Sequence, residues 1–299
     1  MQTLPSVRVF TPELWGQVDK FSQFYKSTHT FNSDTIKAVS GINGHFQKAL
    51  TLRNLAKRLE PNLAIDESEI QEKGYTPANY SMEFAAVIEE VFTELYSSID
   101  CTRKVIVSIY KRCRGIPDST RKIFDRAAKA QIGGFPEELQ QAFYSATWFE
   151  ELLAIRDELT HSNIGSCHKQ IGKSEIIYLH HGIMRNKKPL VIEDIFKKID
   201  EFINGVNLFL GQIFHFLNSK LKSEPTFTMC GFFFGRGYAR TLAIAEHIDF
   251  NSGACQSRQW FDSDPAFRCP FADNCGAYNR AAVSGDALQS EWRFSSAIG

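Results

Sequence analysis

The chain lacks a net charge, because its 34 Lys and Arg residues are matched by 34 Asp and Glu residues over 299 positions. A balanced chain has no global positive field for nucleic acid, although a local basic patch is still compatible with it. The sequence also has no apolar run long enough to span a bilayer. It starts with MQTLPSVRVFTPELW, which has no basic segment followed by an apolar core. We therefore expect a cytoplasmic protein with no membrane-bound part.

The seven cysteines lack the C-x2-C spacing of common zinc knuckles, and their count is odd. In a reducing compartment such scattered cysteines are expected to be thiols or metal ligands rather than disulfides. Four thiolates near the C-terminus would suit a tetrahedral structural zinc, namely Cys230, Cys255, Cys269 and Cys275, with His247 as a possible substitute ligand. The missing knuckle spacing favours buried free cysteines instead, so no cofactor is expected.

Internal repeats and low-complexity tracts are also lacking, whereas apolar residues at helical spacing are frequent up to about residue 222. The chain is therefore predicted to be mainly α, an antiparallel helical bundle. Thr11 and Pro12 are suited to start the first helix, and Gly41 and Gly44 weaken the prediction in the middle of the second. The helices are expected over residues 11–27, 33–59, 81–113, about 118–132, 136–163 and 193–222.

Breaks in the helical pattern indicate three parts. Residues 60–80 are polar and contain two prolines and a glycine, which is typical of a linker. The runs IIYL and PLVI favour two strands with a turn between them, so a small β-hairpin is expected before the last helix. We predict an N-terminal helical extension and linker over 1–78, a helical bundle over 79–222 and a Cys- and aromatic-rich module of irregular structure over 223–299.

In the last part, the segment FFFGRGYAR mixes aromatic residues, glycines and two arginines, Arg236 and Arg240. Such a segment could stack bases and contact phosphates. We interpret it instead as a buried aromatic strand with two surface arginines. Its glycines do not form a dinucleotide fingerprint, because no strand–turn–helix unit surrounds them.

The segment WFEELLAIRDELTHSN combines an apolar stripe with Arg156, Asp157 and His161. A guanidinium can grip phosphate oxygens in two places, and an imidazole is suited to proton transfer near neutral pH. Because RNA supplies its own nucleophile, the ribose 2′-hydroxyl, these two groups could cleave it without a metal. The five-residue step from Arg156 to His161 rotates by about 140° on a helix. Convergence then requires a frayed helix end or a second copy of the helix, which favours a symmetric dimer.

The hexapeptide RDELTH, residues 156–161, resembles the Arg-x4-His motif of the HEPN superfamily. The resemblance covers about residues 79–222 and includes the late position of the motif in an amphipathic helix of a bundle. It implies a metal-independent, dimeric endoribonuclease of toxin–antitoxin or antiviral defence type. Arg156 would hold the scissile phosphate, and His161 would move the proton. Asp157 would be the polar residue that orients them. The product would end in a 2′,3′-cyclic phosphate. An antitoxin or defence-complex partner is also implied, as is an acidic residue on the preceding long helix, either Glu94 or Asp100.

Further RNA contacts are expected around this motif. Ser162 and Asn163 directly follow it and could donate to a phosphate. Lys111 and Arg112 belong to the strongest local concentration of basic residues, which suits a phosphate backbone, although a solvated helix face is the favoured explanation.

A non-catalytic interpretation is also open. Arg156 and Asp157 are then solvated helix charges, and His161 is a C-terminal residue favoured by the helix dipole. Under this second hypothesis the chain is a HEPN-like helical module that binds RNA or nucleotide, or that mediates protein assembly.

Overall fold

The computed structural model describes residues 7–161, 163–169, 174–185, 187–233, 236–245, 247–263 and 268–281. The chain divides into two compact units. One, the helical unit, comprises Gly16–Ser22 and His29–Lys220, and the other, the sheet unit, comprises Met1–Trp15, Gln23–Thr28 and Leu221–Gly299. The second boundary lies close to the expected residue 222, but the extension expected over 1–78 is divided between the two units.

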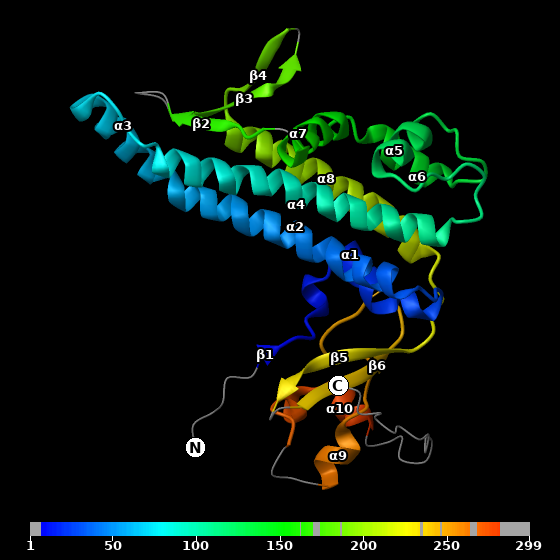
Figure 1. Ribbon diagram of the computed structural model, residues 1–299. Coiled ribbons are helices and arrows are strands. Elements are labelled where there is room, and N and C mark those ends of the chain that lie inside the picture. The colour runs from blue at the N-terminus through cyan, green and yellow to red at the C-terminus, as the bar shows by residue number, and fades with distance from the viewer. Residues whose placement is uncertain are drawn as a thin grey trace, which may run out of the picture. The chain divides into compact units, whose positions relative to one another are not determined.

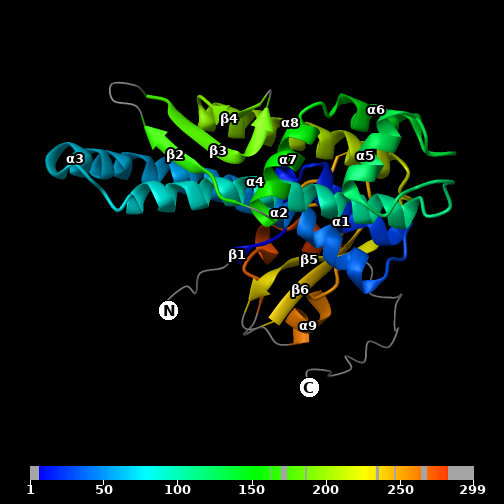
Figure 2. The same ribbon diagram turned by 45° about the horizontal axis from the view of Figure 1, so that its top comes forward.

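The helical unit is built along α4 (Asn79–Ile109), a long helix that packs side by side with α2 (Ser33–Leu59) (Figures 1 and 2). The predicted helix over 33–59 is thus confirmed, and the one predicted over 81–113 is present but begins at Asn79 and ends at Ile109. Asn32 caps α2, because its side chain accepts a hydrogen bond from the Thr35 amide at 2.8 Å. Gly41 does not interrupt this helix. A Cβ on Gly41 would approach the Cys101 sulfur to 2.9 Å, so the glycine permits the close packing of α2 on α4.

The same unit contains α7 (Phe149–His161) and α8 (Ile195–Ser219), which also pack against α4. Their contact faces are apolar, and Phe92 of α4 meets Phe202 of α8 edge to face at 5.8 Å. Burying one such side chain contributes about 1.5–3 kcal/mol. The unit also contains the shorter helices α5 (Thr120–Ala128) and α6 (Glu137–Ser145). The mainly helical fold is therefore confirmed.

Three expected elements differ from the structure. The predicted linker is wrong, because 3-10 helix η3 (Glu60–Asn62) and α3 (Leu63–Lys73) occupy most of it. Asp66 of α3 is buried and accepts hydrogen bonds from the amide and hydroxyl of Ser81, both at 2.7 Å, which fastens α3 to α4. The helix expected over 136–163 is two helices, α6 and α7. The one expected over 11–27 is η1 (Pro12–Leu14), α1 (Gln17–Phe24) and η2 (Tyr25–Ser27), and Thr11 makes no side-chain cap.

The predicted hairpin is confirmed as β3 (Ile176–Arg185) and β4 (Lys188–Ile192). A further strand, β2 (Ser166–Lys169), pairs with β3 and completes an antiparallel sheet of order β2-β3-β4. This sheet follows α7 directly, so it lies next to the end of the helix that carries the Arg-x4-His motif (Figure 1).

The sheet unit contains an antiparallel sheet of order β1-β5-β6-β7. Its strands are β1 (Val7–Arg8), β5 (Thr226–Phe233), β6 (Arg236–Leu242) and β7 (Ala254–Cys255). Short helices α9 (Arg258–Ser263), η5 (Ala272–Asn274) and α10 (Gly276–Ala281) follow. Within the described residues of both units, no helix has the length and apolarity needed to cross a membrane.

Candidate functional site

Helix α7 buries Phe149, Leu152 and Ile155 and thereby turns Arg156 toward α4. The guanidinium carbon of Arg156 lies 4.6 Å from the ring centroid of Tyr96, a cation–π contact. Its Nη1 lies 3.0 Å from Asp157 Oδ1. The arginine is therefore held in place by an aromatic face and a carboxylate, while 29% of its side chain remains exposed.

Arg156 lines a surface pocket of about 440 Å³ between α7, α4, α2 and the start of α5, which we call the Arg156 pocket. The pocket is polar, and it is lined by three cationic side chains, one imidazole, two carboxylates and one phenol. These are Arg103, Lys104, Arg156, His45, Asp100, Asp118 and Tyr96. Both carboxylates pair with Arg103, and Asp100 also pairs with Lys104, so the lining has one cation in excess, which is suited to an anion such as a phosphate.

Asp100 accepts hydrogen bonds from Thr120 Oγ1 at 2.6 Å and from Arg103 Nη2 at 3.0 Å. Burial raises the pKa of this carboxyl, but the bonds from Thr120 and Arg103 outweigh burial, so the pKa lies below its ordinary value. Arg103 Nε is a buried donor for which the described part of the chain supplies no acceptor. Of the two acidic candidates on α4, Asp100 lines the pocket beside Arg156.

Glu94, the other candidate, lies beneath His45. Its Oε2 is 2.6 Å from His45 Nδ1, and its Oε1 accepts from Lys48 Nζ at 2.6 Å. Burial raises the pKa of Glu94, but the hydrogen bonds from Lys48 and His45 lower it by more. The pKa therefore lies below its ordinary value. An ionised carboxylate only accepts, so His45 donates from Nδ1; in the neutral ring the other nitrogen is an acceptor.

The remaining motif residues are placed differently. Asp157 accepts from Arg121 Nη2 at 2.6 Å as well as from Arg156, so it balances two guanidinium groups. His161 is the last residue of α7, is exposed and is not among the residues that line the Arg156 pocket. A single chain therefore brings Arg156 and Asp157 together without His161.

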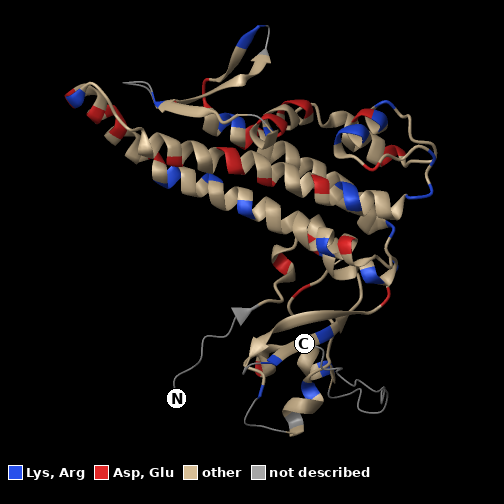
Figure 3. Cartoon of the chain, in the orientation of Figure 1, with Lys and Arg blue, Asp and Glu red and all other residues tan. Residues whose placement is uncertain are grey.

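The expected RNA contacts are scattered. Ser162 lies outside the described residues. Asn163 Oδ1 accepts from the Ile164 amide at 2.9 Å. Lys111 and Arg112 are exposed in the turn after α4, and Lys111 lines a hollow of about 680 Å³ that shares Arg103 and Lys104 with the Arg156 pocket. Figure 3 shows that basic positions around α5 alternate with acidic ones rather than forming a uniform patch.

Sequence reasoning missed His45, Tyr96 and Arg103. His45 lies on α2, which was assigned to a separate extension rather than to the bundle. Gly41 was the available signal, because a glycine inside a helix can mark a close approach to a neighbouring element. His45, four residues later, lies on the same helix face and therefore faces that neighbour. Arg103 was overlooked because nothing in the sequence distinguishes it from the basic residues that follow it, Lys104, Lys111 and Arg112.

In the sheet unit, Cys230, Cys255, Cys269 and Cys275 all line one enclosed cavity. Burial raises the pKa of the Cys230, Cys255 and Cys269 thiols, and it outweighs the lowering by Arg240 at Cys230 and by backbone amides at the other two. Within the described residues, no group of three or more His, Cys, Asp or Glu side chains is arranged to hold a metal ion.

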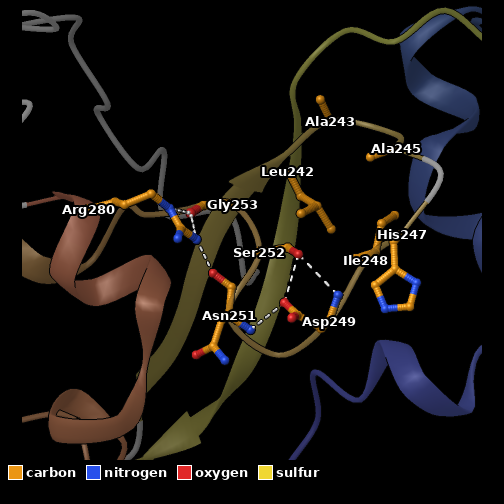
Figure 4. Close-up of a pocket in the computed structure, with 10 residues that line it drawn as sticks. All are labelled: Leu242, Ala243, Ala245, His247, Ile248, Asp249, Asn251, Ser252, Gly253 and Arg280. Atoms are coloured by element: carbon orange, nitrogen blue, oxygen red, sulfur yellow. Dashed lines mark hydrogen bonds between the residues drawn. The ribbon is translucent and has the colours of Figure 1, made fainter.

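His247, the possible substitute ligand, lines a different pocket, together with Asp249 and Arg280 (Figure 4). The polar groups of that pocket bind one another. Asp249 Oδ1 accepts from the Asn251 amide and from Ser252 Oγ, both at 2.9 Å, and Arg280 Nε donates to the Gly253 carbonyl at 3.0 Å. These bonds stabilise the loop, and they make the pocket a weaker candidate for a site.

The interpretation of Arg240 as a surface residue is wrong, because only 2% of it is exposed. Its alternate strand neighbours, Tyr238 and Leu242, are buried on the same face of β6. Arg236, by contrast, is exposed and lies over the Trp260 ring at 4.4 Å. The Arg156 pocket and the cysteine cavity are thus two of the places in the described residues where chemically active side chains gather. No protein-family model, curated protein or solved structure matches the chain.

Proposed function

We propose that this protein is a metal-independent endoribonuclease of HEPN type, active in a toxin or antiviral defence system. The observation that carries the proposal is the Arg156 pocket, where the motif arginine lies over Tyr96 beside two further cations. Arg103 adds a buried donor that lacks an acceptor in the described residues, and a phosphate oxygen would supply one. The pocket thus offers what a ribose-phosphate link requires, which is positive charge, directed donors and a proton acceptor.

The reaction would proceed by attack of the ribose 2′-oxygen on the adjacent phosphorus. The bond from the 2′-oxygen to phosphorus forms, the bond from phosphorus to the 5′-oxygen breaks, and a 2′,3′-cyclic phosphate results. The 2′-hydroxyl gives its proton to an imidazole, and the resulting imidazolium returns a proton to the leaving 5′-oxygen. Arg156 would hold the non-bridging oxygens and stabilise their charge in the transition state.

Two imidazoles are candidates for the proton transfer. The HEPN resemblance assigns the role to His161, which requires a second copy of the chain because His161 does not line the pocket of its own chain. His45 already lines that pocket, and Glu94 fixes its ring at 2.6 Å. Variants of His161 and His45 distinguish the two candidates, and the outcome also decides whether the site needs a dimer.

The proposal is tested by incubating the purified protein with unstructured RNA and following cleavage and the chemical nature of the new ends. We expect cyclic phosphate ends, and we expect Arg156→Ala to lower the cleavage rate by about 100-fold or more, the scale of losing one charge-stabilising donor. Arg58→Ala, which removes an exposed arginine from the far part of α2, is the matched control and should cleave normally. Equal rates for the parent and Arg156→Ala would exclude Arg156 from catalysis.

The second candidate is a non-catalytic module that binds RNA or nucleotide. The position of His161 outside the pocket favours it, since one chain then has the phosphate clamp without the motif imidazole. This candidate predicts that the parent binds RNA without forming new ends, and that Arg156→Ala weakens binding. Cleavage by the parent that is lost in Arg156→Ala would rule it out.

A further inference from the structure

A second hollow, of about 680 Å³, adjoins the Arg156 pocket in the helical unit, and we call it the Lys111 hollow. Its lining comes from the start of α2, from the second half of α4 and from the turn after α4, where Figure 3 shows basic positions. Arg103, Lys104 and Asp118 line both spaces. Each volume lies in the range of about 300–1,000 Å³ that is usual for ligand sites. The helical unit thus has room for a second group beside the one at Arg156.

The two spaces follow a single face of α4. Tyr96 and Asp100 line the Arg156 pocket, Lys104 lines both spaces, and Ser108 and Lys111 line the Lys111 hollow. These residues recur at every third or fourth position, which is the spacing of one helix face. From Tyr96 to Ser108 the helix axis rises by about 18 Å. A surface of that length suits a chain of several nucleotides rather than a single phosphate.

The cations along this face differ in how far carboxylates neutralise them. In the middle, Arg103 pairs with Asp100 and Asp118, and Lys104 lies 3.3 Å from Asp100. At the outer end, Lys111 is exposed, and no ion pair of Lys111 is found among the described residues. A cation beyond a neutralised stretch is suited to a phosphate other than the one at Arg156.

The remaining lining of the Lys111 hollow can contact a sugar and a base. The hydroxyls of Thr30 and Ser108 make no hydrogen bond within the part of the chain that the structure describes, so they are available to a ligand. Phe31 lines the hollow, and its ring is stacked on His29 with 5.5 Å between the centroids. The carboxylate of Asp34 also lines the hollow, but it lies in the first turn of α2, where the helix dipole offsets part of its charge.

We propose that the Lys111 hollow binds the nucleotide that flanks the scissile link, so that the substrate is a single-stranded RNA that extends past the cut. Lys111 would hold the flanking phosphate, while Thr30, Phe31 and Ser108 would meet its sugar and base. The inference rests on the proposed function, because that function places the scissile link at Arg156. A duplex is unsuited to the hollow, since its bases stay stacked and paired, whereas a single strand can turn a base outward.

The test compares uridine oligonucleotides that differ only in what flanks one cleavable link. The dinucleotide UpU is the shortest substrate, and two four-nucleotide chains carry the same link with two further uridines on its 5′ or its 3′ side. All other riboses are 2′-O-methylated, so only that link can react. We expect an extension on at least one side to raise kcat/KM by about 10-fold, mainly through KM, because it adds a phosphate and a base contact. Equal kcat/KM for the three substrates would overturn the proposal.

A pair of variants localises the effect. Lys111→Ala and Arg114→Ala each remove one exposed positive charge from the turn after α4, but Arg114 is not among the residues that line the hollow. We expect Lys111→Ala to raise the KM of the favoured four-nucleotide chain by about 5- to 10-fold, with a much smaller effect on kcat, and Arg114→Ala to match the parent. Equal increases of KM in the two variants would indicate a diffuse charge effect and would overturn the hollow as a site.

An uncleavable probe separates this inference from the nuclease activity. A fluorescein-labelled chain of four uridines with 2′-O-methyl groups throughout has no nucleophile, and its binding is measured by fluorescence anisotropy. If the parent cleaves none of the substrates, the proposed function fails, and this probe alone decides the inference. Binding that Lys111→Ala weakens severalfold and Arg114→Ala leaves at the parent's affinity would support it. Equal affinities of the parent and Lys111→Ala would overturn it, as would the absence of binding.

Discussion

At the scale of the residue, the pocket depends on the carboxylate of Glu94. This group is buried, and it binds both His45 and Lys48 at 2.6 Å, whereas the side chain of its neighbour Glu90 is 40% exposed and pairs with Lys48 at 2.8 Å. Removing the charge of a buried acceptor costs more than removing that of an exposed one, because water does not replace the lost partner.

We therefore predict that Glu94→Gln lowers the free energy of unfolding at neutral pH by about 1–3 kcal/mol, and that Glu90→Gln lowers it by at most about 1 kcal/mol. Because the pKa of Glu94 in the folded chain is below its ordinary value of 4.5, its contribution is present above that value and is lost as the pH falls through the folded pKa. Urea unfolding at several pH values checks this. Equal losses for the two variants would contradict it, as would an acid dependence unchanged in Glu94→Gln.

Single residues also show what the sequence could and could not predict about the site. Arg156 was found from its spacing to His161, and it does lie in a pocket. His45 was not found, because periodicity identifies an apolar stripe but not which helix the polar neighbours of that stripe will face. The burial of Arg240 could have been predicted from the period of two in its strand, but an arginine is rarely buried without a partner, and its sulfur partners are distant in sequence.

At the scale of the element, the long helices and the hairpin were predictable because their apolar periodicity agrees with their burial. The pattern failed where tertiary contacts decide. Helix α3 is polar, and it is held by the buried Asp66 rather than by an apolar face. The helix pattern over 136–163 breaks at Ala146–Trp148, where Trp148 packs against Phe209 of α8 at 6.3 Å between ring centroids.

Helix α8 contains two glycines, one in a crowded position and one in an open position. Substituting each by alanine therefore distinguishes the effect of packing from that of helix propensity. A Cβ on Gly205 would come within 2.5 Å of the Trp148 indole, whereas a Cβ on Gly211 would meet no atom within 4 Å. We predict that Gly211→Ala stabilises the protein by about 0.5–1 kcal/mol, because alanine favours the helix. Gly205→Ala should instead destabilise it by about 1–3 kcal/mol, because the indole must move. Thermal unfolding of both variants checks the difference, and stabilisation by Gly205→Ala would show that Trp148 is not held in this position.

At the scale of the whole molecule, the proposed chemistry depends on how many chains build one site. Helix α7 turns Arg156 into the pocket, but it places His161 at its exposed end. The two residues are about 140° apart around the helix, so no change of side-chain rotamer brings them together on a straight helix. A second α7 related by a two-fold axis could supply the missing imidazole, and each dimer would then contain two equivalent composite sites.

Mixing two inactive variants distinguishes this arrangement from a site built on His45. If Arg156 and His161 act across a dimer axis, Arg156→Ala and His161→Ala are each inactive alone. A refolded equimolar mixture should recover about a quarter of the parent's rate, because half of the dimers are mixed and each holds one complete site. The readout is the cleavage rate of unstructured RNA, measured before and after subunit exchange. If the proton instead moves through His45 of the same chain, His161→Ala retains activity and His45→Ala loses it. A mixture of His45→Ala with Arg156→Ala then recovers no activity, and the composite site would be discarded.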